Sequence, residues 1–283
     1  MTTLQEQSAY LHAIDGIRIF YRQWRHPQAR GAVVLVHGLG EHGGRYQALA
    51  DVFLQSGLSV RIHDQRGHGR SDGARGSLHR SDDYLTDLQL VFDDFAVQEA
   101  CTPWLFGHSM GGLVAARFAT GGISPVQGLM LSSPALGIAL SAFQKVLLAV
   151  STRVAPGFAV PSSLPAQRLS HDATVTRAYT EDSLNHGKVA ARVVNFMLAA
   201  MQQVQQDASR FTLPLLLQIA GDDAFVVPQA SQSFFAQLPQ GDKCFYCYQD
   251  AYHEIFNESA PHRAQVVQDL TAWLALHLPQ TAV

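Results

Sequence analysis

Residues 104–112, Trp-Leu-Phe-Gly-His-Ser-Met-Gly-Gly, join a short apolar run to an alanine-rich stretch of helical composition. We interpret residues 104–106 as the end of a buried strand and residues 113–119 as the first turns of a helix. Ser109 therefore stands on a sharp strand-to-helix turn, which pushes its hydroxyl out at the top of a sheet. The glycines on either side keep the turn free of side-chain clashes. This context, more than the Gly-x-Ser-x-Gly string, indicates a serine nucleophile.

A serine hydroxyl becomes a good nucleophile when a histidine takes its proton and a carboxylate holds that histidine. Residues 213–220 form an apolar run of strand length, and Asp222 and Asp223 follow it at once. We predict Asp223 as the carboxylate because the residues after it lead into Pro228 and a new helix. Asp222 is expected to cap the turn.

The histidine is expected in the loop after the next strand. Residues 243–248 form that strand candidate, and His253 follows it. The chain has 13 histidines, so position rather than composition selects this one. The order Ser109, Asp223, His253 is that of α/β-hydrolases, in which working residues project from the carboxyl ends of parallel strands.

An oxyanion intermediate needs backbone N–H donors close to the nucleophile. The N–H of Met110 lies at the start of the predicted helix, where unpaired donors favour negative charge. A second donor is expected in the glycine-rich loop His-Gly-Leu-Gly that follows the valine-rich strand candidate 32–36, at the N–H of Leu39. We expect His37 to support this loop without transferring protons.

Several blocks of the sequence resemble the monoacylglycerol lipase and lysophospholipase family of α/β-hydrolases. They are His-Gly-Leu-Gly-Glu-His-Gly-Gly-Arg-Tyr at 37–46, Asp-Gln-Arg-Gly-His-Gly-Arg-Ser-Asp-Gly at 64–73 and Gly-His-Ser-Met-Gly-Gly at 107–112. The segments around Asp223 and His253 are similar to the family too. The resemblance implies the same triad and the same oxyanion hole as the positional argument.

The resemblance also implies that Glu41 and Arg45 shape the pocket for the alcohol, or glycerol, part of a substrate. Their four-residue spacing equally allows a plain helical ion pair worth about 0.5 kcal/mol, or simple anchoring of the loop. Both interpretations stay open at this point. Phe256 stands where the mammalian enzymes of the family carry a second histidine near the glycerol.

The amino-acid composition argues against several classes of function. The 283 residues are 47% hydrophobic, which suits one large core with an insertion. A net charge of −3 without a run of basic residues argues against a nucleic-acid partner. The polar start at 1–7, the lack of a spanning apolar stretch and only three cysteines favour a cytoplasmic protein. Cys244 and Cys247 should point to opposite faces of one strand, which favours buried core cysteines over a metal or redox site.

The fold class predicted is α/β: an α/β-hydrolase fold with a mostly parallel sheet flanked by helices. The core comprises residues 1–134 and 211–283. Residues 135–210 interrupt the strand–helix rhythm after the sixth strand and are predicted to form a helical cap, with helices at 138–154 and 189–204. Further elements are expected as a hairpin at 10–24, strands at 58–63 and 127–132, and helices at 45–56, 81–100, 110–120, 229–238 and 261–277.

These observations predict a serine ester hydrolase that cleaves monoacylglycerols, or similar small lipid monoesters, through an acyl-enzyme and without a metal or organic cofactor. The alternatives are a lysophospholipase, and a general carboxylesterase or thioesterase for short-to-medium acyl groups. A non-catalytic binding protein on a hydrolase fold is a remote alternative, because a binding protein has no need of all three triad residues. A transient lipid-surface contact through the cap is expected, and no obligate protein partner is implied.

Overall fold

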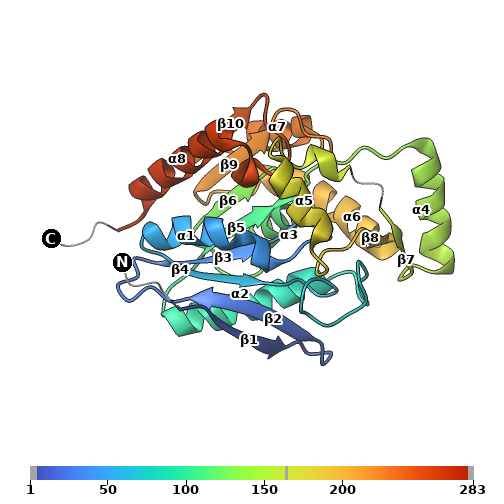
Figure 1. Ribbon diagram of the computed structural model, residues 1–283, viewed down its shortest axis with the longest axis horizontal. Helices are drawn as coiled ribbons and strands as arrows, with labels where there is room; N and C mark the ends of the chain where they lie inside the picture. Colours follow the sequence, from blue (N-terminus) through green and yellow to red (C-terminus); the bar gives the residue numbers. More distant parts are fainter. Residues whose placement is uncertain (1–4, 163–164, 280–283) are drawn as a thin grey trace.

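The computed structural model describes residues 5–162 and 165–279, so the parts of the predicted core and cap at 1–4, 163–164 and 280–283 lie outside it. A twisted sheet runs through the middle of the molecule (Figure 1). Its eight strands lie in the order β1 (Gln7–His12), β2 (Arg18–Trp24), β4 (Ser59–His63), β3 (Ala32–Val36), β5 (Trp104–His108), β6 (Leu129–Ser132), β9 (Leu215–Ala220) and β10 (Lys243–Tyr248).

The sheet is parallel from β4 to β10, and β2 pairs antiparallel with both β1 and β4. Every residue of β3, β4, β5, β6 and β9 is buried, because helices cover both faces of a parallel sheet. The predicted hairpin turns at Gly16, whose φ of 84° suits glycine. The mostly parallel sheet was therefore correctly predicted.

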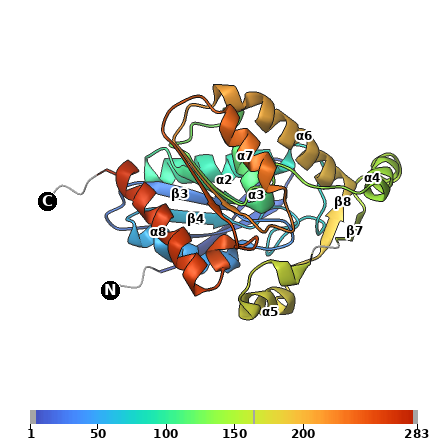
Figure 2. The ribbon, with the colours of Figure 1, turned by 90° about the horizontal axis from the view of Figure 1, so that it is seen from above.

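Two apolar layers join the helices to the sheet. One face carries the helices α1 (Gln47–Gln55) and α8 (Ala260–His277). The other face carries α2 (Asp83–Glu99), α3 (Ser109–Thr120), α6 (Ala191–Asp207) and α7 (Pro228–Gln237). Figure 2 shows the sheet edge-on between these layers. All five helices predicted for the core are present within about two residues of the expected bounds.

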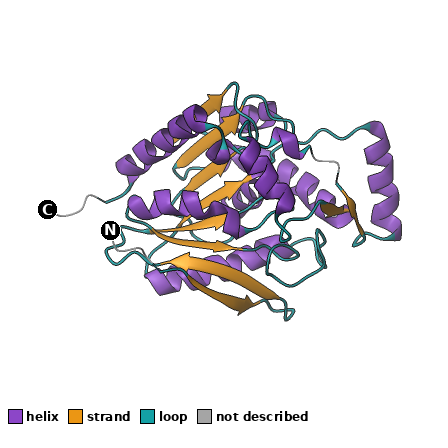
Figure 3. Cartoon of the chain, viewed as in Figure 1, coloured by secondary structure: helices purple, strands orange, loops and turns teal. Residues whose placement is uncertain are grey.

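Residues 135–210 contain more structure than two helices. They form α4 (Ala142–Val154), α5 (Ala173–Glu181) and α6, with a short antiparallel ribbon of β7 (Ala159–Pro161) and β8 (Lys188–Ala190). Figure 3 shows α4 and the ribbon beyond the carboxyl edge of the sheet. Short 3₁₀ turns occur at Gly43–Tyr46, Ala166–Arg168, Ala208–Arg210 and Ile255–Asn257.

The two predicted cap helices differ in how they pack. α4 starts at residue 142 rather than 138 because Ser141 and Gln144 form a reciprocal capping box, and none of its residues is buried. α6 buries Val193, Phe196 and Met201 in the same cluster as α3. The division into a core and a cap at 135–210 remains a prediction, and α6 packs as part of the layer beside the sheet.

Cys244 and Cys247 point to opposite faces of β10, as predicted, but the prediction that both are buried was wrong. Cys244 packs on the side of α1 and α8, and Cys247 on the opposite side, as the strand period requires. Both are only half-buried, since β10 is an edge strand of the sheet.

Candidate active site

Ser109 lies at the junction of β5 and α3, as predicted, and its backbone is strained. Its φ of 54° places a non-glycine residue in the left-handed region, which is uncommon and is found at functional turns. A Cβ atom at Gly107 would lie 2.7 Å from the Cα of Gly112 and 2.8 Å from the Cβ of Ala115. Gly111 packs equally closely on the backbone at the end of β3. Glycines on both sides therefore allow the turn that presents the hydroxyl.

The three residues predicted as a triad meet at the carboxyl edge of the sheet. The Nε2 atom of His253 lies 2.8 Å from the Oγ of Ser109, and its Nδ1 atom lies 2.7 Å from Oδ2 of Asp223. The side chains of His253 and Asp223 are 3% and 1% exposed. This is the geometry in which an imidazole can accept a serine proton while a buried carboxylate fixes its tautomer.

Asp223 and Asp222 have the different environments that their positions suggested. Burial alone would raise the pKa of Asp223, but His253 and the backbone N–H groups of Phe225 and Val226 outweigh it and lower that pKa. Asp223 is thus held as a carboxylate. Asp222 points away, is exposed, and pairs with Arg168 at 2.5 Å.

The predicted oxyanion loop lies beside Ser109. Leu39 and Met110 line the same cavity as Ser109 and His253. His37 holds this loop, because its Nε2 accepts the backbone N–H of Gln65 at 2.9 Å and its Nδ1 lies 2.7 Å from the carbonyl oxygen of Gly38. Burial lowers the pKa of His37, which keeps it neutral and agrees with a supporting role.

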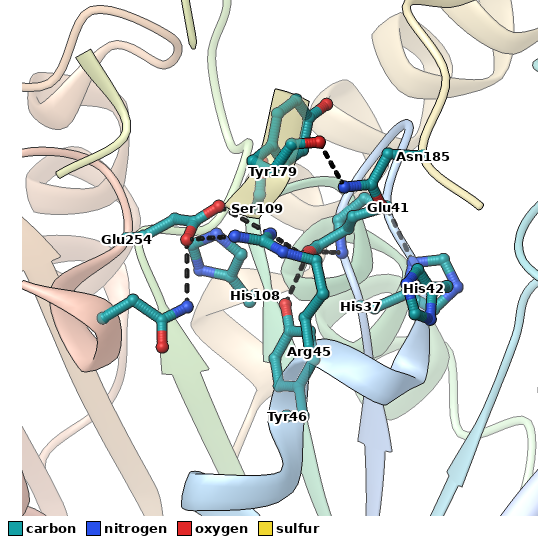
Figure 4. A network of polar contacts seen from close by, with 12 residues as sticks. His37, Glu41, His42, Arg45, Tyr46, His108, Ser109, Tyr179, Asn185 and Glu254 are labelled. Carbon is teal, nitrogen blue, oxygen red and sulfur yellow. Dashed lines mark hydrogen bonds and ion pairs between the residues drawn. The ribbon is translucent and has the colours of Figure 1, made fainter. Parts of the chain in front are cut away.

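Glu41 and Arg45 form a buried ionic network that reaches the loop of the histidine (Figure 4). Arg45 pairs with Glu41 through Nη1 and with both oxygens of Glu254, each at 2.7 Å. Glu41 also accepts the N–H of Gly38 and the hydroxyl of Tyr46, each at 2.6 Å. Although its burial opposes ionisation, the Arg45 charge lowers the pKa of Glu41 to about 2.

This network resolves part of the question that the sequence left open. The ion pair of Glu41 and Arg45 exists, yet it is buried and shared with Glu254 rather than solvent-exposed on a helix. Glu41 lines the cavity, whereas Arg45 lies behind it beneath the ring of Tyr179, 4.9 Å from the ring centre. Phe256 packs edge-on against a phenylalanine of β5 at 5.6 Å between ring centres, on the core side.

Glu254 and Tyr179 were not predicted from the sequence. Glu254 follows His253 directly. An acidic residue immediately next to the predicted catalytic histidine is the sequence signal that could have identified it. Tyr179 comes from α5, a helix of nine residues that was not expected.

A cavity of about 690 Å³ opens over Ser109. Its end near the triad is polar, with Glu41, Glu254 and His108 in the wall. Its long wall, from α4, the β7–β8 ribbon and α6, is mostly apolar and includes Phe143, Leu147, Phe158, Val160, Val194 and Met197. The site thus combines a nucleophile with one polar and one apolar compartment.

The described residues contain neither a cluster of metal-ligating side chains nor a helix suited to span a membrane. Within 5–162 and 165–279, no three His, Cys, Asp or Glu side chains are grouped so that they could hold a metal ion. No helix in that part of the chain is long and apolar enough to cross a membrane.

The chain matches proteins of known family over most of its length. The model of the family described as serine aminopeptidase, S33, matches residues 27–260. The monoacylglycerol lipase of Mycolicibacterium smegmatis is 34% identical over 272 residues, 94% of this chain and 95% of that protein. The phospholipase YtpA of Bacillus subtilis is 30% identical over 254 residues, 88% of this chain and 97% of that protein.

A solved structure agrees with these sequence relatives. The crystal structure of a monoacylglycerol lipase from Paleococcus ferrophilus matches with a TM-score of 0.83 and 29% identity, covering 97% of this chain and 100% of that one. The strained serine turn, the parallel sheet and this likeness are mutually consistent. The chain therefore belongs to the serine aminopeptidase, S33, family of α/β-hydrolases, as a serine hydrolase related to monoacylglycerol lipases.

Proposed function

We propose that this enzyme hydrolyses monoacylglycerols to a fatty acid and glycerol through an acyl-enzyme on Ser109. One observation carries the proposal. The hydrogen-bonded residues Ser109, His253 and Asp223 lie at the polar end of a cavity that has a long apolar wall. The names of the relatives from M. smegmatis and P. ferrophilus support it.

In the proposed mechanism, Ser109 attacks the ester carbonyl while His253 takes its proton, and Asp223 fixes the imidazole tautomer. The oxyanion forms against the N–H groups of Leu39 and Met110. His253 then protonates the leaving alcohol. Water attacks the acyl-enzyme with the same histidine as base, which releases the fatty acid and frees Ser109.

The charges around the cavity favour a glycerol ester over a lysophospholipid. The carboxylates of the wall belong to Glu41 and Glu254, and no lysine or arginine is among its described lining residues. A phosphate on the alcohol would meet two carboxylates that share the single cation Arg45, which is already paired with both and lies behind the wall, so the phosphate would gain no partner of opposite charge. Glycerol hydroxyls can instead donate hydrogen bonds to carboxylates.

A stripe of exposed valines on α4 supports a proposed contact with a lipid surface. Val146, Val150 and Val154 follow one another at intervals of four, lie on one side of the helix and are 64%, 54% and 79% exposed. None of them lines the cavity. We place the enzyme in the cytoplasm, with reversible attachment of this stripe to a lipid surface on which its substrates are dissolved.

The deciding experiment compares kcat/KM on three esters, with Ser109→Ala as the control. The esters are dodecanoylglycerol, the lysophospholipid with the same acyl chain, and p-nitrophenyl butyrate. We expect the glycerol ester to exceed the lysophospholipid at least about tenfold, and Ser109→Ala to lose more than about 10⁵-fold in turnover.

Each contrary result has a distinct meaning. Equal rates on the lysophospholipid would favour a phospholipase, as in the relative YtpA, and would overturn the charge argument. Preference for the short ester would make the protein a general carboxylesterase. Undiminished activity of Ser109→Ala would overturn the mechanism altogether.

A further inference from the structure

One short segment before α5 contacts the loops that carry the acid and the histidine of the proposed triad. We call this segment, residues Arg168 to His171, the clasp. Its Leu169 and Ser170 are 5% and 3% exposed, although the segment belongs to the region predicted as a cap. The clasp and its partner loops are 54 or more positions apart in sequence, so these contacts are tertiary.

The first contact joins the clasp to the acid loop. Arg168 places Nη2 2.5 Å from Oδ1 of Asp222, the residue directly before Asp223. The same guanidinium lies over the ring of Tyr252, 4.1 Å from its centre, and Nη1 lies 3.3 Å from the phenol oxygen. One side chain therefore links the residues that precede the proposed acid and the proposed base.

The second contact closes around the other side of the histidine loop. The ring of His171 stacks on Tyr252 with centres 3.6 Å apart, so that Tyr252 is held by both Arg168 and His171. The Nδ1 atom of His171 lies 2.8 Å from Oε1 of Glu258, whose side chain is fully buried. Glu258 in turn accepts the backbone N–H of Tyr252 at 2.8 Å.

A third contact fixes the residue after the histidine. The backbone N–H of Glu254 donates to the carbonyl oxygen of Leu169 at 2.8 Å. Both peptide neighbours of His253, residues 252 and 254, are thus bonded to the clasp or to a partner of it. A residue held on both sides cannot shift its backbone independently, so the imidazole inherits the position that the clasp sets.

We propose that Arg168 and His171 are positioning residues of the catalytic machinery. They act through Tyr252, Asp222 and Glu258 and do not touch the substrate. The inference rests on the proposed function, because it assumes that His253 is the base. Misplacing a catalytic group by about 1 Å can lower a rate about a hundredfold, so a loosened clasp is expected to affect the chemical step first.

The test compares the variant Arg168→Ala/His171→Ala with the wild-type enzyme on p-nitrophenyl butyrate, whose acyl chain is too short to need the apolar wall. Both side chains are partly exposed, at 35% and 40%, so the fold should survive their truncation. We expect kcat to fall about tenfold to hundredfold while KM stays within about twofold. The matched control is Arg177→Gln, an exposed arginine on α5, for which both constants should be unchanged.

A spectroscopic measurement separates positioning from a general loss of structure. The proton between His253 Nδ1 and Asp223 should give a downfield NMR resonance in the wild type and in Arg177→Gln. It should broaden or disappear in the double variant. The single variants show rescue: His171→Ala should lower kcat and broaden the resonance, whereas in His171→Asn the amide Nδ2 can replace the imidazole Nδ1 as donor to Glu258 and should restore both in part.

The outcomes are distinct. A kcat within twofold of the wild type, or a reduced kcat with an unchanged resonance, would overturn the positioning role. If the double variant does not fold, the single variant His171→Ala decides by the same two measurements. If wild type and Ser109→Ala hydrolyse the ester alike, the proposed function fails first, and the clasp experiment would show no catalytic effect to explain.

Discussion

The clasp and α4 belong to the same stretch between β6 and β9, yet they are held in opposite ways. The clasp is bound through ion pairs, a stacked ring and backbone hydrogen bonds to the loops of the proposed triad. α4 buries none of its residues, and Phe143 and Val154 at its two ends are 76% and 79% exposed. Figure 1 shows α4 standing at the far end of the molecule from the sheet.

This difference suggests that two parts of the segment between β6 and β9 have different roles. Directional polar contacts fix geometry, as positioning a base requires, whereas apolar contact is non-directional and tolerates chains of different length. The clasp should therefore control turnover, and α4 should control which acyl chain is bound. Changes in one region should leave the other property intact.

Among the changes that test this comparison, the largest effect is expected at Asp223, the residue after the clasp's partner Asp222. Asp223→Asn keeps the size of the side chain but removes the charge and can impose the wrong imidazole tautomer. We expect kcat to fall about 10⁴-fold on short and long esters alike, as at the corresponding position of other serine hydrolases. Asp222→Asn, one position earlier and exposed, is the matched control and should lose no more than the clasp variants. Steady-state kinetics on both esters checks this, and a loss confined to long esters would contradict it.

Acid should destabilise the fold through buried histidines that lie outside α4, a helix that contains no histidine and no acidic residue. Burial lowers the pKa of His108 and of His186 to about 4. His186 belongs to the segment after α5, and its backbone N–H donates to Gly40 in the oxyanion loop at 2.8 Å.

The sign follows from proton uptake. The unfolded chain binds these protons near pH 6.5 and the folded chain only near pH 4, so stability present above about pH 6.5 is lost as the pH falls to about 4. For the fully buried His108 alone this amounts to about 3 kcal/mol. Urea unfolding at several pH values measures it, and the exposed His12→Gln should keep the wild-type slope. A free energy of unfolding that does not change over this range would contradict the assignment.

The positions of the candidate site residues that follow strands could be predicted from the sequence. Ser109, Asp223 and His253 each come in the first few residues after the strands β5, β9 and β10, and the carboxyl ends of such parallel strands meet at one edge. The parallel sheet and the helices beside it follow from the same local alternation. What is local in sequence, or repeated at every strand end, could be predicted.

The clasp and α5 could not be predicted in this way. α5 reads Ala-Thr-Val-Thr-Arg-Ala-Tyr-Thr-Glu, and its apolar face of Val175, Ala178 and Tyr179 spans too few residues to establish a helical period. The partners of Arg168 and His171 lie 54 to 87 positions away, and no spacing rule connects them. The contact between Glu254 and Arg45 could not be predicted for the same reason, because the two residues are 209 positions apart.

The smallest expected effect concerns α4, where one pair of apolar residues lines the cavity and a neighbouring pair does not. Phe143 and Leu147, the inner pair, line the cavity, whereas Val146 and Val150, the outer pair, lie beside them on the same apolar face of the helix and do not line it. If the inner pair contacts the acyl chain, Phe143→Ser/Leu147→Ser should lower kcat/KM for a dodecanoyl ester about tenfold relative to the butyrate, which corresponds to the burial of about two methylene groups.

The outer pair supplies the matched variant. Val146→Ser/Val150→Ser removes similar apolar surface from the same helix, so it should preserve chain-length preference for monomeric esters and weaken sedimentation with phosphatidylcholine vesicles. Neither variant should change kcat on the butyrate, since the contacts that hold the clasp run to Asp222, Tyr252 and Glu258 and involve no residue of α4. A loss of butyrate turnover in either variant would show that the two regions are coupled, and the separation of chemistry from chain selection would then be wrong.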